Sequence, residues 1–140
     1  MDSFNSNLQQ NNRKVPEVSS LIRTIQEVLE DNPNIIFAYL YGSIVESDHF
    51  KDIDIALYAI QGGAGSLRLE AEVQIKLSEK SGLSPDFFDV RVINKAPVSF
   101  AIRVLTKGKH LLSRDEELRS DYIERISSTY RKDFRIFEAT

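Results

Sequence analysis

The sequence predicts one α+β domain, in which a small β-sheet is backed by helices. Two observations carry this prediction. Apolar runs rich in β-branched and aromatic residues, which are typical of strands, occur at residues 35–41, 52–60 and 87–93. Around them lie amphipathic segments whose apolar residues recur every three or four positions, as on one face of a helix. With 140 residues, the chain is long enough to bury a core.

The composition excludes several classes of function. Cysteine is absent, so the chain has no disulfide framework, no cysteine-ligated zinc and no thiol nucleophile. The net charge of −3 argues against a surface devoted to nucleic-acid phosphates, although a single nucleotide needs far less basic surface. No apolar run approaches the roughly 18 residues of a membrane span. The first residues do not read as a secretory leader, so we expect a cytoplasmic protein.

The first half of the chain is predicted to contain one helix and an antiparallel pair of strands. Residues 1–14 are polar and read as a disordered lead-in, and residues 15–140 as a single domain. A helix begins near Pro16 and ends at the sequence DNPN. The strands at 35–41 and 52–60 are joined by a segment too short for a parallel crossover, so they should be antiparallel.

The second half is predicted to contain two further strands and three helices. Residues 66–80 alternate like a strand, but their length and their Leu, Glu and Lys content favour a helix. One of two apolar stripes on that helix should face the sheet: Leu67, Ala71 and Ile75, or Leu69, Val73 and Leu77. The remaining elements are the strand at 87–93, a helix from Pro97 to Gly108, an edge strand at KHLL, and a last helix capped by Ser113 with Glu116 completing a capping box.

Three aspartates in or beside the most apolar strands are candidate functional residues. Asp52 and Asp54 are two positions apart, so in a strand they point to the same face, about 6–7 Å apart. Asp89 lies in a neighbouring strand. Partly buried like charges repel, and divalent cations resolve that repulsion, since Mg²⁺ takes carboxylate oxygens, waters and phosphates as ligands. The three carboxylates therefore indicate a metal site, in which two ions would share bridging and flanking carboxylates.

Gly42 and Ser43 end the first strand at the same edge of the molecule as these carboxylates. Glycine lets the backbone approach a ligand closely, and the serine can cap a helical turn whose N–H groups face an anion. A phosphate chain on these amides would have its metals held by Asp52 and Asp54. The pattern indicates displacement at a nucleotide phosphate.

Each of these residues also has a structural interpretation. Gly-Ser alone is a common turn, Asp52 could cap a loop, and Asp89 could pair with Arg91 or Lys95. Asp54 is the hardest to explain in this way, because isoleucines flank it on both sides. Buried like charges seldom persist without a metal or a partner, so the constellation as a whole favours a functional site.

The stretches LYGSIVESDHFKDIDIAL and FFDVRVINKAPVSFAIRVLTKGKHLL resemble the minimal nucleotidyltransferase family of the DNA-polymerase-beta-like superfamily. The resemblance implies a small mixed sheet backed by helices. It implies that Gly42 and Ser43 bind triphosphate and that Asp52 and Asp54 hold metal. It also implies that Asp89 binds metal and helps to activate the attacking hydroxyl.

The stretch NKAPVSFAIRVLTKGKHLLSRD resembles, more narrowly, a subgroup of antitoxins that pair with a HEPN-type ribonuclease toxin. This resemblance implies that AMP passes from ATP to a tyrosine of the toxin, with two Mg²⁺ ions, in a hetero-oligomer of the two proteins. Two other functions stay open: an antitoxin that neutralises its toxin by binding alone, and a nucleotidyltransferase for a small molecule. Ile44 and Ser47 depart from the family pattern of a basic residue and a glycine, so the grip on triphosphate should be weaker or come from the partner.

Overall fold

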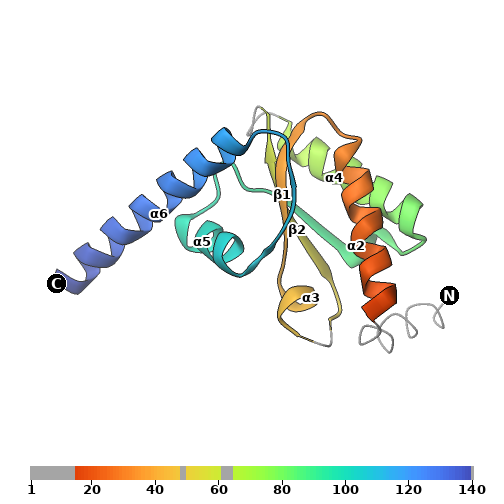
Figure 1. The fold of residues 1–140 in the computed structure, drawn as a ribbon, viewed down its shortest axis with the longest axis horizontal. Helices are drawn as coiled ribbons and strands as arrows, with labels where there is room; N and C mark the ends of the chain where they lie inside the picture. The colour runs from red at the N-terminus through yellow and green to blue at the C-terminus, as the bar shows by residue number, and fades with distance from the viewer. Residues whose placement is uncertain (1–14, 48–49, 61–64, 140) are drawn as a thin grey trace.

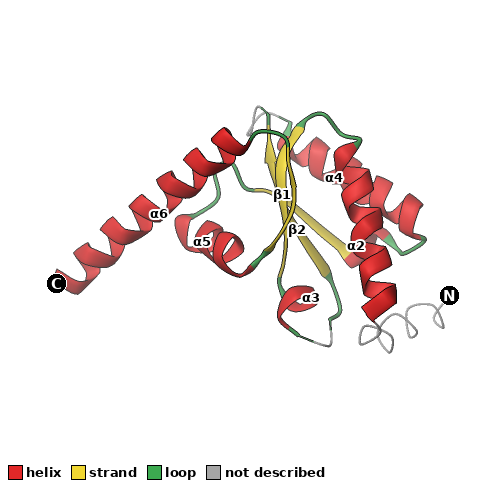
Figure 2. Ribbon diagram, viewed as in Figure 1, coloured by secondary structure: helices red, strands yellow, loops and turns green. Residues whose placement is uncertain are grey.

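The computed structural model describes residues 15–47, 50–60 and 65–139, so the predicted lead-in at 1–14 lies outside the described residues. Within them, a four-stranded mixed sheet has helices on both faces (Figures 1 and 2), which confirms the predicted α+β class. No helix in these ranges is long and apolar enough to cross a membrane. The elements in chain order are α2 (Val15–Glu30), β1 (Ile35–Tyr41), α3 (Ser43–Glu46), β2 (Ile53–Ala59), α4 (Ser66–Ser81), the 3-10 helix η1 (Pro85–Phe87), β3 (Phe88–Val92), α5 (Val98–Lys107), β4 (Lys109–Ser113) and α6 (Glu116–Ala139).

The strand order β3-β2-β1-β4 combines antiparallel and parallel pairing in one sheet. β1 and β2 are antiparallel, as their short connection predicts, and Tyr41 is opposite Asp54. β3 runs parallel to β2, with Asp89 beside Asp54. The crossover between these parallel strands contains α4, as such a connection requires. The register thus brings residues of three adjacent strands together at one end of the sheet.

Two apolar clusters pack on opposite faces of the sheet, because successive strand side chains point to opposite sides. α2 and α4 cover one face, where Ile53, Ile55 and Val90 are buried. α5 and the first turns of α6 cover the other face, where Phe37 and Ala56 are buried. Figure 1 shows these helical layers on either side of the sheet.

α4 confirms the predicted helix and shows which of its two apolar stripes faces the core. Leu69, Val73 and Leu77 are buried under the sheet. Leu67 and Ile75 belong to the other stripe and are 80% and 54% exposed. The alternating pattern that resembles a strand arises because an apolar stripe on the surface lies beside the apolar stripe in the core.

The last helix begins differently from the prediction. Its N-cap is Asp115, whose carboxylate accepts a hydrogen bond from the Leu118 amide at 3.0 Å. Ser113 does not cap the helix, because its backbone belongs to β4, which pairs with β1. The predicted capping box of Ser113 and Glu116 is therefore wrong.

Arg114, directly after β4, holds the C-terminal end of α2 against the sheet. Its guanidinium donates hydrogen bonds to the backbone carbonyls of Ile35 at 2.8 Å, of Leu29 and Asn32 at 3.3 Å, and of Glu30. The last carbonyls of a helix have no partner within the helix, so these bonds satisfy them. One side chain thus holds α2 and β1 to the segment that connects β4 to α6.

Candidate active site

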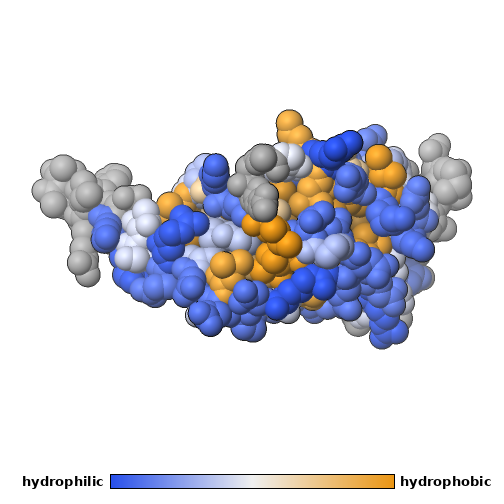
Figure 3. Space-filling model, turned by 90° about the horizontal axis from the view of Figure 1, so that it is seen from above, coloured by the Kyte–Doolittle hydropathy of each residue, from blue (hydrophilic) through white to orange (hydrophobic). Residues whose placement is uncertain are grey.

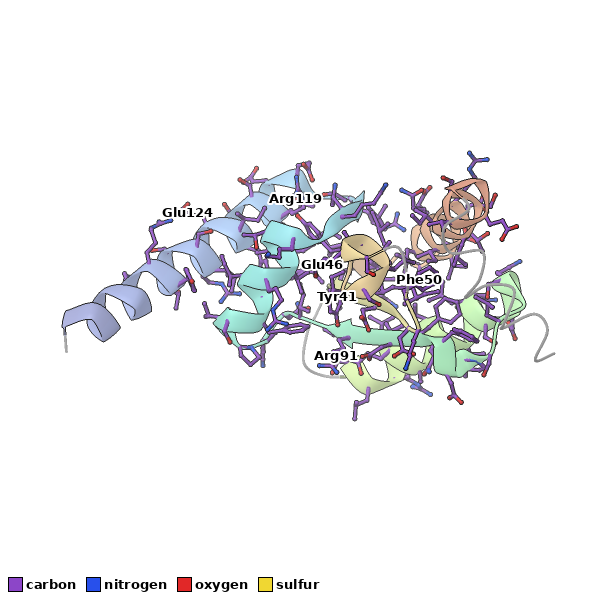
Figure 4. All side chains as sticks on the ribbon, turned by 90° about the horizontal axis from the view of Figure 1, so that it is seen from below. Tyr41, Glu46, Phe50, Arg91, Arg119 and Glu124 are labelled. Atoms are coloured by element: carbon purple, nitrogen blue, oxygen red, sulfur yellow. The ribbon has the colours of Figure 1, made fainter. Side chains whose placement is uncertain are left out.

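A row of three side chains from adjacent strands forms the centre of the candidate site. Tyr41 ends β1 and is paired with Asp54 of β2, which in turn is paired with Asp89 of β3. Asp54 points to the same face as Ala56, two positions on, and Ala56 packs in the cluster under α5. The row therefore lies on the α5 side of the sheet, in the region where Figure 4 labels Tyr41 and Arg91.

Asp52 lies just outside the strand in which it was predicted. β2 begins at Ile53, one residue later than expected, and Asp52 is exposed. Asp54 itself is only partly buried. Hence one carboxylate of the predicted pair is fixed by the strand, whereas the other belongs to the connection that precedes it.

Gly42 brings the end of β1 against Asp54. Its backbone has φ of +80°, a conformation that residues with side chains rarely adopt. A Cβ at this position would overlap Oδ2 of Asp54, so no side chain fits there. Gly42 therefore lies directly against Asp54, and Ser43 follows it at the start of α3.

Ile44 explains one departure from the family pattern. Gly42 is followed by the single turn α3, which closes with bonds from the Val45 and Glu46 amides to the Gly42 carbonyl at 3.0 and 3.1 Å. The Ile44 side chain is buried and joins the core on the α2 side of the sheet. A residue in this place serves packing, whereas Ser43, Val45 and Glu46 of the same turn are exposed.

The charge of Asp54 is disfavoured in its surroundings. Partial burial raises the pKa of its carboxyl group, and the negative charges of Asp89 and then Asp52 raise it further, against an opposing effect of Arg91. The negative charges of Asp52 and Asp89 thus both act on Asp54. A cation placed among them would remove the repulsion.

Asp89 forms an ion pair with Arg91. The Nη2 atom of Arg91 lies 3.3 Å from Oδ2 of Asp89, and Nε lies 3.4 Å from Oδ1. The structural alternative of an Asp89–Arg91 pair is thus present. Both side chains are about half exposed, at 44% and 57%, and exposed ion pairs are weak and easily exchanged.

The donor atoms suit Mg²⁺, but they are not gathered into a finished metal site. Carboxylate oxygens are the ligands that Mg²⁺ prefers, and they carry the unbalanced charge that raises the pKa of Asp54. Across the described ranges, no three His, Asp or Glu side chains are close enough together to hold a metal ion. Asp89 turned toward Arg91 and Asp52 outside the strand are the two features that keep the set apart.

Phe100 and Arg91 flank the row, and Phe100 and Tyr41 are site residues that the sequence did not indicate. The ring of Phe100, in α5, meets the Tyr41 ring edge-on at 5.5 Å, and the Arg91 guanidinium lies over Phe100 at 5.7 Å. Burial, followed by the charges of Asp54 and Asp89, raises the pKa of Tyr41 to about 12, with Arg91 opposing. The antiparallel pairing could have indicated Tyr41, but nothing in the linear sequence places Phe100 here.

The comparisons with known proteins agree with this geometry. A family model described as polymerase beta, nucleotidyltransferase matches residues 23–117, a range that includes all four strands and all three aspartates. The fold described above is that of a nucleotidyltransferase domain. Because the match covers more than half of the chain, the protein belongs to the polymerase beta nucleotidyltransferase family. Among curated proteins, no sequence matches the chain.

Several solved structures with the same fold are toxin–antitoxin complexes. One is the complex of a tri-AMPylated HEPN toxin from Shewanella oneidensis with an MNT antitoxin, with a TM-score of 0.63, 22% identity, and coverage of 82% of this chain and 87% of that chain. A second is the MntA–HepT complex, with a TM-score of 0.61, 23% identity, and coverage of 81% and 87%. A third is a toxin–antitoxin structure with AMP-PNP, with a TM-score of 0.64, 24% identity, and coverage of 79% and 87%. At these identities the likeness shows the shared fold.

Proposed function

We propose that the protein is a Mg²⁺-dependent adenylyltransferase that moves AMP from ATP to a tyrosine of a HEPN-type ribonuclease toxin, and so acts as the antitoxin. The observation that carries the proposal is that Asp54, which lies against Gly42, is repelled by the negative charges of both Asp89 and Asp52. Membership of the nucleotidyltransferase family supports it. The likeness to complexes of HEPN toxins, one of them tri-AMPylated and one holding AMP-PNP, supports the choice of acceptor and nucleotide.

The carboxylates would hold the metal. Asp52 and Asp54 are proposed as ligands of two Mg²⁺ ions, with Asp89 as the third carboxylate once it leaves Arg91. Bound Mg²⁺ would neutralise the phosphates and make the α-phosphorus more electrophilic. The donor set fits this role because Asp54 carries a charge that its neighbours disfavour and that a cation would stabilise.

The chain's own residues would then orient the nucleotide and deprotonate the acceptor hydroxyl. Gly42 and Ser43 would hold the β- and γ-phosphates through their backbone N–H groups at the start of α3. The acceptor oxygen forms a bond to the α-phosphorus, the bond from that phosphorus to the bridging oxygen breaks, and pyrophosphate leaves. The hydroxyl proton passes to Asp89. No protein nucleophile takes part, so the rate enhancement comes from positioning and charge stabilisation.

The test is transfer of label from α-labelled ATP to the purified toxin in the presence of Mg²⁺. We expect the wild-type protein to add AMP to a tyrosine, which mass spectrometry identifies, and Asp54→Ala to abolish the transfer. Asp121→Ala, an exposed carboxylate on α6, is the matched control and should transfer normally. Equal labelling by wild type and Asp54→Ala, or none by either, would contradict the proposal.

A second function, neutralisation of the toxin by binding alone, is favoured by one observation. Leu67 and Ile75 form an exposed apolar stripe on α4, on the opposite side of the sheet from the carboxylates. If binding alone protects cells, the double variant Asp52→Ala and Asp54→Ala should still protect, whereas Leu67→Ser with Ile75→Ser should not. The reverse result would assign protection to the chemistry.

A further inference from the structure

An open hollow of about 600 Å³ lies along the free edge of β3, next to Asp89. Building on the proposed function, we propose that this hollow is the acceptor-binding site, and that Phe100 and Arg91 position an aromatic hydroxyl side chain in it. Its walls come from β3, from Glu70 of α4, and from the segment that leads into α5. The lining residues are Glu70, Asp89, Val90, Arg91, Val92, Ala96, Pro97 and Phe100.

The position of the hollow agrees with the geometry of an in-line displacement. In such a reaction the attacking and leaving oxygens lie on opposite sides of the phosphorus. Gly42, where the leaving phosphates are proposed to bind, lies on the β1 side of Asp54. The hollow lies on the β3 side, beyond Asp89. A hydroxyl that enters from the hollow would therefore approach opposite the leaving group.

The walls suit the ring of an aromatic side chain. Phe100 is partly exposed, and aromatic rings pair edge-on or offset, as Phe100 already does with Tyr41 at 5.5 Å. The planar guanidinium of Arg91, 5.7 Å from the Phe100 ring centre, can stack on a further ring. Pro97 and Ala96 add apolar surface. The volume is within the usual range for a pocket that buries a small ligand.

The charge of the lining argues against a nucleotide triphosphate as the occupant. Glu70 and Asp89 are acidic, and Arg91, the one basic residue of this lining, is paired with Asp89. A triphosphate in this place would meet Glu70, which is not among the proposed metal ligands, and the lining offers it no cation other than the paired Arg91. A neutral tyrosyl ring has no such penalty, and its hydroxyl could reach Asp89.

The edge of β3 favours entry of a side chain over addition of a strand. An exposed strand edge can bind an extended peptide through its backbone N–H and C=O groups. Here the Glu70 carboxylate already accepts a hydrogen bond from the Val92 amide at 2.8 Å. The next amide, of Ile93, donates to the Leu57 carbonyl of the neighbouring strand β2. The acceptor is therefore expected to insert a side chain between Glu70 and Phe100.

The first test compares the KM values of the two substrates in steady-state transfer to the toxin. Phe100→Leu keeps an apolar side chain but removes the ring, and should raise the KM for the toxin about tenfold or more, the usual effect of a lost apolar contact in a pocket. The KM for ATP should stay unchanged, and Phe100→Tyr should restore the wild-type value. Leu105→Ala is the control, because Leu105 packs from the same helix against the same cluster as Phe100.

The same comparison of KM values tests the role of Arg91. Arg91→Lys keeps the charge but loses the planar guanidinium, so it should also raise the KM for the toxin, while Arg103→Lys on the exposed face of α5 should not. If the KM for ATP rises and that for the toxin does not, the hollow holds nucleotide and the inference is wrong, although the proposed function survives. If neither KM changes, the hollow takes no part in binding.

A second measurement does not depend on transfer. N-acetyltyrosinamide and N-acetylserinamide are titrated into the protein, saturated with AMP-PNP, and side-chain NMR signals of Phe100 and Arg91 are followed. We expect shifts with the tyrosine amide alone, and none in Phe100→Leu. Shifts without any transfer activity would preserve the hollow as an aromatic site and remove the proposed function. Absence of shifts with both amides would overturn the inference.

Discussion

The carboxylate of Asp54 occupies the space that a side chain at position 42 would need. This relationship couples the two halves of the candidate site, because the glycine proposed to meet phosphate and the aspartate proposed to hold metal are fixed against each other. The antiparallel pairing of β1 and β2, which sets Tyr41 opposite Asp54, imposes it. A side chain at position 42 would therefore displace the Asp54 carboxylate.

Gly42→Ala should therefore destabilise the fold and abolish transfer. The alanine would need a left-handed backbone and would overlap Oδ2 of Asp54, and a strained position of this kind costs about 1–3 kcal/mol. Gly82→Ala is the control for a positive φ alone, because Gly82 has φ of +79° in the αL region and no atom within 4 Å of its added Cβ, whereas Gly42 has ψ of −155°, a region that is essentially limited to glycine. Urea unfolding should show a larger loss for Gly42→Ala. Equal losses would mean that the contact with Asp54 contributes nothing.

Asp54→Asn should stabilise the metal-free protein at neutral pH while it removes activity. Folding raises the pKa of Asp54 above its ordinary value of 3.8, so the wild-type fold loses stability as pH rises from that value through the raised pKa. The neutral amide avoids this loss, and its advantage should vanish below the ordinary pKa. Urea unfolding with EDTA at several pH values measures the difference.

The control for this prediction is Asp121→Asn, on the exposed face of α6, where the change should stay within about 0.5 kcal/mol. Added Mg²⁺ should stabilise the wild-type protein and leave Asp54→Asn unaffected. If Asp54→Asn is less stable than wild type at neutral pH, the carboxylate makes favourable contacts that outweigh its repulsion by Asp89 and Asp52.

Tyr122 should be important for stability and should ionise only at high pH. Its hydroxyl donates a buried hydrogen bond to the Ile93 carbonyl at 2.8 Å, and burial raises its pKa to about 12. Tyr122→Phe removes this hydrogen bond and leaves the Ile93 carbonyl with the Ala96 amide, at 3.1 Å, as its partner, so we expect a loss of about 0.5–1.5 kcal/mol in the free energy of unfolding. The stability that depends on neutral Tyr122 is present below its ordinary pKa of 10.0 and is lost as pH rises through about 12.

Absorbance titration of tyrosinate should accordingly show an ionisation phase near pH 12, to which Tyr41 and Tyr122 both contribute. The phase should shrink in Tyr122→Phe and in Tyr41→Phe. Tyr130→Phe, at an exposed position of α6, is the control for stability. An unchanged phase in Tyr122→Phe would show that this hydroxyl is not buried in solution.

Arg114→Lys should destabilise the protein although it keeps the charge. The guanidinium serves four carbonyls of α2, its following turn and β1, and an ammonium group cannot reproduce that planar fork. We expect a loss of about 2 kcal/mol in the free energy of unfolding. Faster amide exchange at the end of α2 should accompany it. Arg103→Lys is the control, and equal stability of the two variants would contradict a capping role.

The fold could be predicted from the sequence where the signals are local. The antiparallel β1–β2 pair follows from the length of the connection, and the helical nature of α4 follows from its composition. The cap of α6 could not be predicted in the same way. Ser113 and Asp115 are both good capping residues, and the pairing of β4 with β1 extends to Ser113 and leaves Asp115 as the N-cap.

The candidate site likewise has some features that the sequence could predict and others that it could not. The grouping of Asp54 with Gly42 and Asp89 could be anticipated, because strand order and the period of two fix it. The pairing of Asp89 with Arg91, two positions on, depends on the rotamers that both side chains adopt at the exposed edge strand β3. The approach of Phe100 to Tyr41 depends on how α5 packs across the sheet, and no local pattern encodes that distance.

The Arg91–Asp89 pair has a consequence for the sequence of events in catalysis. While it persists, the guanidinium contacts both carboxylate oxygens of Asp89, which would otherwise be available to a divalent ion, and it also lies over the ring of Phe100, which lines the hollow. Arrival of the metallated nucleotide would release that guanidinium toward the incoming ring. We therefore expect ordered addition, with nucleotide first and toxin second, and product-inhibition patterns would reveal it.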